Sequence, residues 1–416
     1  MSAIPATSRR RYRFSDVLPI TYVNNWQPQS LSRPSVPPMT LDAIINRDNL
    51  VRIFKHVRSH AGQGPGIDGY RYSQFSVSEA GDVARVICQE IKRQAWRPRR
   101  SRAKSIPKQP SGTRTLRIRC AMDRLVSAAV SEVITHELEF VLFQNTFAYR
   151  PHRCVQGLLA QAARHIERDG LSVVGKDDVR DAFGSIRIED AVRDYARIVD
   201  DAELLHLIEV ILRGHDRSEV GIEQGDPLSP PTLNLRSHFC LSLPSPRTTG
   251  SNTPLRLSYA DDHVYLSHSV SEGQRAVESD GALLAGSNMN FKGRDNYPID
   301  LRRQGASTQI LGLRIRLADD QVMFGLSGRA YQKLEAKLQD ALSCPDTVTV
   351  AKAMVAGWYL GHGPAFESCG GESSFQRVQS LLAAVGLHEL ASIQFLRQVA
   401  SQAVSHWRRL RYREEE

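Results

Sequence analysis

Several features that mark common protein classes are missing from this sequence. Its 416 residues include six cysteines, at positions 88, 120, 154, 240, 344 and 369, which form no CxxC pair and follow no metal-ligand spacing. We therefore expect no zinc module. We expect the cysteines to be reduced thiols in a cytoplasm. No apolar run approaches the length of a membrane span, and the N-terminus lacks the apolar core of a secretory signal. We expect no membrane partner and a cytoplasmic location.

The charge balance favours a polyanionic partner. The net charge is +9 and the pI is about 9.3, which is modest for this length but basic. Residues 1–40 combine Pro- and Ser-rich sequence with Arg9, Arg10, Arg11 and Arg13. This composition predicts a flexible basic N-terminal arm of the kind that contacts phosphates. A leader without a function and an organellar transit peptide are the alternatives.

Apolar spacing predicts helices on both sides of a central region. The first two lie within residues 41–60, separated by the polar run 46–49, and further helices are expected at 77–96 and 123–143. In the C-terminal region, helices are expected near 331–338, 350–359, 375–385 and 390–410. The sequence contains no internal repeat.

A pair of acids lies between two runs that predict strands. Residues 255–258 and 263–266 flank Tyr259, Ala260, Asp261 and Asp262, and a hairpin is the economical interpretation. Like charges at a turn repel each other unless protonation or a cation compensates them. A divalent metal would be that compensation, although the pair alone also fits an ordinary solvated loop.

Two other stretches bear on this choice. Residues 171–175 predict a strand that runs into Asp177 and Asp178, and the sequence QGDPLSP occupies residues 224–230. An acid at the end of a strand, a Gln-Gly turn before Ser-Pro and an Asp pair in a hairpin therefore follow one another along the chain.

These stretches resemble signature blocks of the reverse transcriptases, in the same order. The blocks are Asp178-Val179-Arg180-Asp181-Ala182-Phe183, the segment 224–230 and Tyr259-Ala260-Asp261-Asp262. Other segments resemble the bacterial group II intron lineage of that family, namely 64–69, 106–108, 112–118, 123–124, 147–151, Lys292, 310–313 and 356–359. The resemblance covers roughly residues 40 to 410.

The resemblance implies an α+β fold of the right-hand polymerase type, with fingers, an antiparallel-sheet palm and a helical thumb. The implied domains are fingers at 41–165, palm at 166–318 and thumb at 319–416, after the arm at 1–40. The implied activity is RNA-directed DNA synthesis by phosphoryl transfer from dNTPs to a DNA or RNA primer on a structured RNA template. Such transfer rests on alignment and charge neutralisation.

Two Mg²⁺ ions, or Mn²⁺, are the implied cofactors, because few carboxylates plus substrate oxygens satisfy such ions. The resemblance makes Asp178 and Asp261 direct ligands, Asp262 a ligand through water or an orienting group, and the backbone carbonyl of Val179 a further ligand. Asp178 is preferred to Asp177 because an apolar residue follows it directly and the aromatic Phe183 comes five positions later.

The resemblance also implies nucleotide contacts. Phe183 matches a steric gate that disfavours a 2′-hydroxyl, and an ordinary core aromatic is the alternative. Gln224 resembles a residue that contacts the nucleotide near the same sugar, and Gly225 gives the backbone room for close approach. Lys292 resembles a proton donor to pyrophosphate, and a surface lysine is the alternative. Lys108 and Arg114 are the implied triphosphate contacts.

Cations crowd residues 92–124, where Asp123 is the only acid. Alternation with apolar residues predicts a hairpin with one basic face that follows a template backbone, and a solvated surface is the alternative. At the C-terminus, aromatic and basic residues alternate over 407–413, which suits RNA contact or a frayed helix end. The candidate RNA contacts are Arg97, Arg99, Arg100, Arg117, Arg150, Arg408 and Arg409, and a structural role is the alternative for Arg150.

Departures from the family bear on the biological role. Segments 147–151 and 228–234 are drifted versions of the group II blocks, and no endonuclease or RNase H domain is expected after Tyr412. We expect a domesticated, defence-associated or retron-like enzyme that copies an associated noncoding RNA in antiviral defence. The alternative is a group II intron maturase without an endonuclease domain, acting chiefly as an RNA-binding folding factor. The sequence does not predict the oligomeric state or the priming mechanism.

Overall fold

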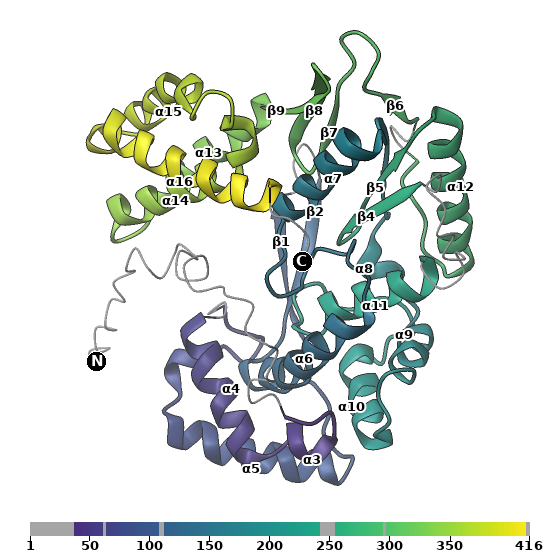
Figure 1. The fold of residues 1–416 in the computed structure, drawn as a ribbon. Helices are drawn as coiled ribbons and strands as arrows, with labels where there is room; N and C mark the ends of the chain where they lie inside the picture. Colours follow the sequence, from purple (N-terminus) through teal and green to yellow (C-terminus); the bar gives the residue numbers. More distant parts are fainter. Residues whose placement is uncertain (1–36, 61–63, 108–111, 242–253, 294–296, 413–416) are drawn as a thin grey trace.

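The computed structural model describes residues 37–60, 64–107, 112–241, 254–293 and 297–412. Within these ranges helices are combined with antiparallel sheets, which confirms the α+β class (Figure 1). The described strands form a two-stranded sheet β1-β2, a four-stranded sheet in the order β4-β5-β3-β6 and a three-stranded sheet β7-β8-β9. None of the helices in these ranges has the length and apolar character needed to cross a bilayer. The arginines of the predicted N-terminal arm lie outside the described residues.

Local capping explains where the first helices begin. They are α3 (Leu41–Ile44), α4 (Arg47–His60) and α5 (Val77–Lys92), with the 3₁₀ turn η1 (Tyr72–Gln74) before α5. The Asn46 side chain accepts a hydrogen bond from the backbone N–H of Asn49 at 2.9 Å, which confirms the predicted break between two helices. Ser76 and Glu79 cap the start of α5 reciprocally, at 2.8 and 3.2 Å.

The cation-rich region folds as the predicted hairpin. Strands β1 (Arg102–Pro107) and β2 (Thr113–Ile118) pair antiparallel, with Arg102 opposite Ile118. Helix α6 (Ala121–Val141) follows and buries its apolar face in the largest core, together with α4 and α5. The hairpin therefore projects from a rigid helical base (Figure 1).

The four-stranded sheet is the centre of the molecule. Its strands are β3 (Val173–Asp178), β4 (Leu255–Tyr259), β5 (Asp262–Ser267) and β6 (Ile299–Asp300). Val174 and Leu266 are cross-strand neighbours that share a core with α7 (Val155–Asp169). Gly175 faces the other way, and a Cβ there would lie 3.4 Å from Val277 of α12 (Val270–Gly286). The sheet is thus covered by α7 on one face and α12 on the other (Figure 1).

In the described part of the connection between β3 and β4, four helices are present that were not among the predicted ones. They are α8 (Ala182–Ser185), α9 (Ile188–Tyr195), α10 (Ala202–Arg213) and α11 (Ser229–Leu241). They join the same core as α3 to α6. The backbone N–H of Leu41 donates to the Asp201 carboxylate at 2.9 Å, so the start of the described chain is tied to the start of α10.

The C-terminal part consists of a small sheet and a helical group. The sheet contains β7 (Thr308–Ile310), β8 (Leu313–Ala318) and β9 (Gln321–Leu326), and the helices are α13 (Gly328–Ala341), α14 (Thr347–Gly361), α15 (Glu372–Ala384) and α16 (Ile393–Arg411), with 3₁₀ turns η2 (Gly363–Phe366) and η3 (His388–Leu390). All four predicted C-terminal helices are therefore present. Helix α16 anchors the group, because Trp407 is fully buried and Arg164 of α7 donates to the Leu410 carbonyl oxygen at 3.1 Å.

Candidate active site

The register of the central sheet brings two of the predicted acids together. Asp178 ends β3 and Asp262 begins β5, and the two are direct cross-strand partners. Residues opposite each other in an antiparallel pair point to the same face, with Cβ atoms about 5 Å apart. The two carboxylates, which are distant in the sequence, therefore lie side by side.

The turn of the β4–β5 hairpin adds the third acid. Tyr259 pairs with Asp262, which leaves Ala260 and Asp261 as the turn. The Asp261 carbonyl oxygen accepts a hydrogen bond from the Val179 N–H at 2.9 Å, so the turn is held against the end of β3. Ala260 has a φ of 56°, a conformation that costs an L-residue about 1 kcal/mol or more. This strain lies at the point where the three acids meet, as is common at functional sites.

Asp177 is directed elsewhere. Its register partner is His263 rather than Asp262, so its side chain leaves the opposite face of the sheet. The Asp177 carboxylate accepts from the backbone N–H groups of Asp178 at 2.8 Å and Gly293 at 3.3 Å. This buried group supports the backbone behind the site, which agrees with the preference for Asp178.

Lys292 lies at the site. Its ammonium group forms an ion pair with the Asp178 carboxylate, and its backbone N–H donates to the Asp178 carbonyl oxygen at 2.9 Å. The alternative was an exposed surface lysine, whereas this side chain is 25% exposed, and its part in the chemistry stays a prediction. A positive charge beside clustered carboxylates offsets their mutual repulsion, and a cation that binds Asp178 would compete with it.

The Asp262 carboxyl is in a setting that disfavours its charge. Burial and, to a smaller extent, the charge of Asp261 raise its pKa to about 6, while the charge of Lys176 opposes the rise. Asp262 as a residue keeps contact with solvent, while protein atoms and the neighbouring acid crowd its carboxyl. A cation that binds there must displace a proton when the pH is below about 6.

This pKa predicts a proton release linked to metal binding. Titration of the protein with Mg²⁺ near pH 6 should release about half a proton per site from Asp262, and near pH 8 almost none. The release is measured by calorimetry in buffers with different ionisation enthalpies. The Asp262→Asn variant should lose the release near pH 6, and a variant that retains it would assign the proton to another group.

Phe183 and Gln224 lie on neighbouring segments. Phe183 belongs to the short helix α8 and is half-buried against the main core. Its carbonyl oxygen accepts from the N–H of Ile222 at 2.9 Å, two residues before Gln224. The two predicted ribose contacts are thus joined by backbone hydrogen bonding close to the end of β3.

Gly225 makes a close backbone approach, and its partner in the structure is strand β2. Its φ is 116°, and a Cβ there would lie 2.9 Å from the carbonyl oxygen of Arg117 in β2. The backbone N–H of Arg117 also donates to the Gln224 carbonyl oxygen at 2.8 Å. The glycine therefore lets this loop pack against the β1–β2 hairpin.

The hairpin register divides its cations between two faces. Arg102, Lys104 and Arg114 fall on one face by alternation, whereas Arg117 falls on the other. The face of Arg102, Lys104 and Arg114 also carries Ile106, Leu116 and Ile118. The predicted hairpin is therefore present, but the expectation of a single basic face is wrong. Lys108, the other predicted triphosphate contact, lies outside the described residues.

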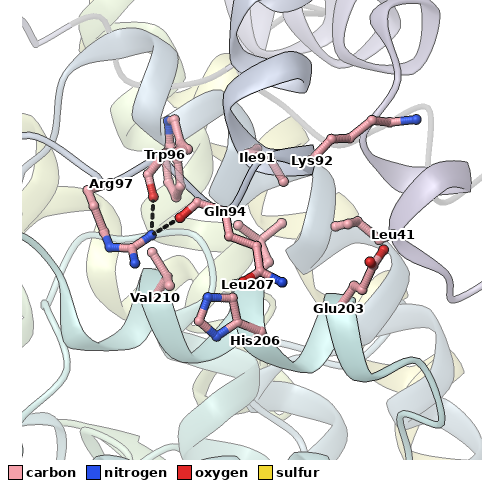
Figure 2. A pocket seen from close by; sticks show the side chains of 10 residues that line it. All are labelled: Leu41, Ile91, Lys92, Gln94, Trp96, Arg97, Glu203, His206, Leu207 and Val210. Atoms are coloured by element: carbon pink, nitrogen blue, oxygen red, sulfur yellow. Dashed lines mark hydrogen bonds between the residues drawn. The ribbon is translucent and has the colours of Figure 1, made fainter.

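The remaining predicted RNA contacts differ in their surroundings. Arg99 and Arg100 are exposed and approach Asp68 at 3.7 Å and Asp216 at 3.6 Å. Figure 2 shows Arg97 at a pocket between α5 and α10, where it donates to the carbonyl oxygens of Gln94 at 3.1 Å and Trp96 at 2.7 Å. None of the predicted catalytic residues lines this pocket.

Arg150 does not have the position of an RNA contact. Its side chain is 1% exposed and pairs with Glu139 at 2.8 Å. The same guanidinium donates to the carbonyl oxygens of Phe143 at 2.6 Å and Thr146 at 3.0 Å. The prediction of RNA contact is corrected for this residue, because a guanidinium buried in such a network shapes the loop instead.

The C-terminal basic segment is split in the same way. Arg408 and Arg409 are exposed on α16, so their RNA contacts stay predictions. Arg411 is buried and pairs with Glu167 and Glu367. Trp407 donates its indole N–H to Glu367 at 2.8 Å, so the described end of α16 is anchored. Residues 413–416, which belong to the alternative of a frayed end, lie outside the described residues.

Tyr149, which belongs to the drifted segment 147–151, borders the site. It is 46% exposed and has a φ of 59°. Burial raises the pKa of its hydroxyl, the charges of Asp261 and Tyr259 raise it further, and Arg114 opposes them. Arg114 and Asp261 are therefore both within electrostatic reach of the Tyr149 hydroxyl, a relation that one sequence does not reveal.

Comparison with known proteins finds no match by sequence and distant matches by structure. No family model and no curated protein matches the chain. Telomerase from Candida albicans in complex with a TWJ fragment of telomeric RNA is 10% identical over 77% of this chain and 64% of its own, with a TM-score of 0.43. Apo telomerase from Candida tropicalis is 10% identical over 74% and 64%, with a TM-score of 0.45. The chain thus spans about 64% of the length of these structures, and likeness of this degree carries no conclusion about activity.

Proposed function

We propose that this protein is a reverse transcriptase of the group II intron-like bacterial lineage, an RNA-directed DNA polymerase. The observation that carries the proposal is the meeting of Asp178, Asp261 and Asp262 at one end of the central sheet. Their order and sequence context resemble the family blocks. In this proposal residues 41–165 are the fingers, 166–318 the palm and 319–416 the thumb.

The donor set suits Mg²⁺ better than a metal that needs a protein cage. Among the described residues, no three or more His, Cys, Asp and Glu side chains, the three acids included, are arranged to hold a metal ion by themselves, so substrate oxygens and water would have to supply the other ligands. Hard cations that keep substrate oxygens and water as ligands need few carboxylates. Asp178, Asp261, the Val179 carbonyl and Asp262 would hold two Mg²⁺ or Mn²⁺ ions. When bound, these ions would activate the primer hydroxyl and neutralise charge on the triphosphate.

The other residues have positions that suit a nucleotide between the hairpin and the sheet. Arg114 would bind the triphosphate with Lys108, since guanidinium and ammonium groups complement phosphate oxygens. Phe183 would close the space beneath the sugar, and Gln224 would contact its edge. Lys292, beside Asp178, would supply a proton or a positive charge to the leaving pyrophosphate.

We further propose that the template is a structured noncoding RNA that stays bound to the protein, and that the cDNA serves antiviral defence. The exposed Arg99, Arg100, Arg408 and Arg409 support an RNA partner. The drift of segments 147–151 and 228–234 from the group II blocks supports a domesticated role. Sequencing of the RNA and DNA that copurify with the protein tests it, and intron RNA in that fraction would favour the maturase alternative.

The polymerase assignment is tested by primer extension. Wild type, given a primed RNA template, dNTPs and Mg²⁺, should extend the primer, and Asp261→Asn should not. Asp320→Asn, in the exposed β8–β9 turn, is the matched control and should extend normally. Equal extension by wild type and Asp261→Asn, or none by either, would replace this proposal with an RNA-binding folding factor.

A further inference from the structure

One arginine of the cation-rich segment is buried instead of exposed. Arg119 follows β2 directly, and its side chain is 2% exposed. Its guanidinium pairs with Glu223 and, at 3.0 Å, with Asp226. It also donates to the Ile211 carbonyl oxygen at 2.7 Å and the Ser127 hydroxyl at 3.3 Å. These partners come from separate parts of the chain, so Arg119 joins β2 to α6, α10 and the loop before α11.

The two acids bracket the residue proposed to contact the nucleotide. Glu223 and Asp226 are the immediate neighbours of the Gln224-Gly225 pair. Glu223 also accepts a hydrogen bond from the Ser101 hydroxyl at 2.5 Å, next to the start of β1. The loop is therefore fixed at both ends by ionic contacts.

Backbone contacts fix the same loop between those ends. The Arg117 N–H donates to the Gln224 carbonyl oxygen at 2.8 Å, and Gly225 allows the close approach to the Arg117 carbonyl described above. A shift of β2 would thus move Gln224, and a shift of the loop would move the strand that carries Arg114.

Stability alone gives a weak reason for this network. Burial raises the pKa of the fully buried Asp226, against the charge of Arg119, so holding these charges in the interior has a cost. Apolar residues of similar volume commonly serve as well or better in such places. A buried ionic group is most useful where it fixes one arrangement of two elements.

We infer that Arg119 is a positioning residue, which locks the loop of Gln224 to the β1–β2 hairpin so that Gln224 and Arg114 approach one nucleotide together. The inference rests on the proposed polymerase function. It assigns a role in nucleotide affinity to a residue that touches no substrate. Loosening the lock should weaken nucleotide binding and leave the chemical step, which depends on the three acids, largely intact.

Glu223→Gln is the variant of choice, because Glu223 is the more exposed acid of the pair at 22% and glutamine can still bond to Ser101. We expect KM for dNTP to rise about 5- to 20-fold while kcat changes less than about 3-fold. Arg119→Lys should show the same pattern in milder form than Arg119→Met, since it keeps the charge but not the fork of donors.

Asp194→Asn is the matched control. Asp194 of α9 forms a buried ion pair with Arg236 of α11 at 2.7 Å, away from the loop of Gln224. It should lower the melting temperature with no change in KM for dNTP. If Glu223→Gln also lowers only the melting temperature, Arg119 is merely structural and the inference is overturned.

Hydrogen exchange separates this inference from the proposed function. Glu223→Gln should raise amide exchange at least about 10-fold in peptides covering residues 113–118 and 222–228, and Asp194→Asn should not. That result would support the lock even if wild type extended no primer, in which case only the polymerase proposal would fail. Unchanged exchange in both segments would overturn the lock whatever the activity.

Discussion

Asp178→Asn is expected to lower the rate of primer extension roughly 1,000-fold or more, because an amide cannot supply the charge that a two-metal site requires. The substitution is close to isosteric and keeps the backbone hydrogen bonds to Asp177 and Lys292. The fold should therefore persist, and circular dichroism and the melting temperature should show it. Single-turnover extension of a primed RNA template measures the loss.

Lys292→Gln distinguishes the two sides of the Asp178 ion pair. We expect a smaller loss, about 10- to 100-fold, because in the proposed function Lys292 would assist departure of pyrophosphate without holding a metal. Lys333→Gln, an exposed position on α13, should have no effect. A Lys292→Gln enzyme as active as wild type would reduce the ion pair to a structural contact, and an active Asp178→Asn enzyme would remove the polymerase proposal.

Most of the candidate site could be predicted because its elements are local in sequence. The strand before Asp178 and the hairpin around Asp261 are each encoded within about a dozen residues. That β3 lies between β5 and β6 has no local signature, and the resemblance implied only that the palm sheet is antiparallel. The end of β3 and the hairpin turn therefore lie side by side, as expected. Residues that lie near the acids, such as Tyr149, were not predicted.

The fates of the arginines show where sequence reasoning stops. Arg117 and Arg119 of the basic segment and Arg150 of segment 147–151 look alike in the sequence, yet the structure exposes the first and buries the other two. What separates them is an acid elsewhere in the chain, 104 residues away in the case of Arg119. Arg411 likewise meets an acid 244 residues away. Such pairings follow from tertiary packing, and charge patterning alone predicts a solvated or RNA-facing surface.

The helices between β3 and β4 illustrate a different limit. Helix α11 has ten buried residues, and polar groups such as Asn234 are among them. The Asn234 side chain donates to the Ala148 carbonyl oxygen at 2.7 Å, so a drifted block and a buried polar helix support each other. A helix that is buried on all sides shows no amphipathic stripe. The sequence of α11 therefore carries no helical pattern of apolar residues that would predict it.

Phe183→Val is expected to reduce discrimination against ribonucleotides about 10- to 100-fold. The ring is half-buried and stands on α8, whose backbone is tied to the segment that leads to Gln224. Valine removes the bulk beneath the sugar, so a 2′-hydroxyl should fit, while the remaining branched side chain still packs against the core. The ratio of kcat/KM for dNTP to that for the matching NTP measures the change.

Phe239→Val controls for the loss of an aromatic from the same core. Phe239 lies on α11, half-buried, with the Arg197 guanidinium 4.5 Å from its ring centre. This variant should lower the melting temperature at least as much as Phe183→Val, since both remove similar buried area, but its sugar discrimination should equal that of wild type. If the two variants discriminate equally between dNTP and NTP, Phe183 has no special effect on the sugar. It is then an ordinary core aromatic. A change in sugar discrimination at Phe183 alone would instead indicate that the sugar of the incoming nucleotide lies against α8. Helix α8 follows the strand that ends at Asp178, so the sugar would then lie close to the acids proposed to act on the phosphate.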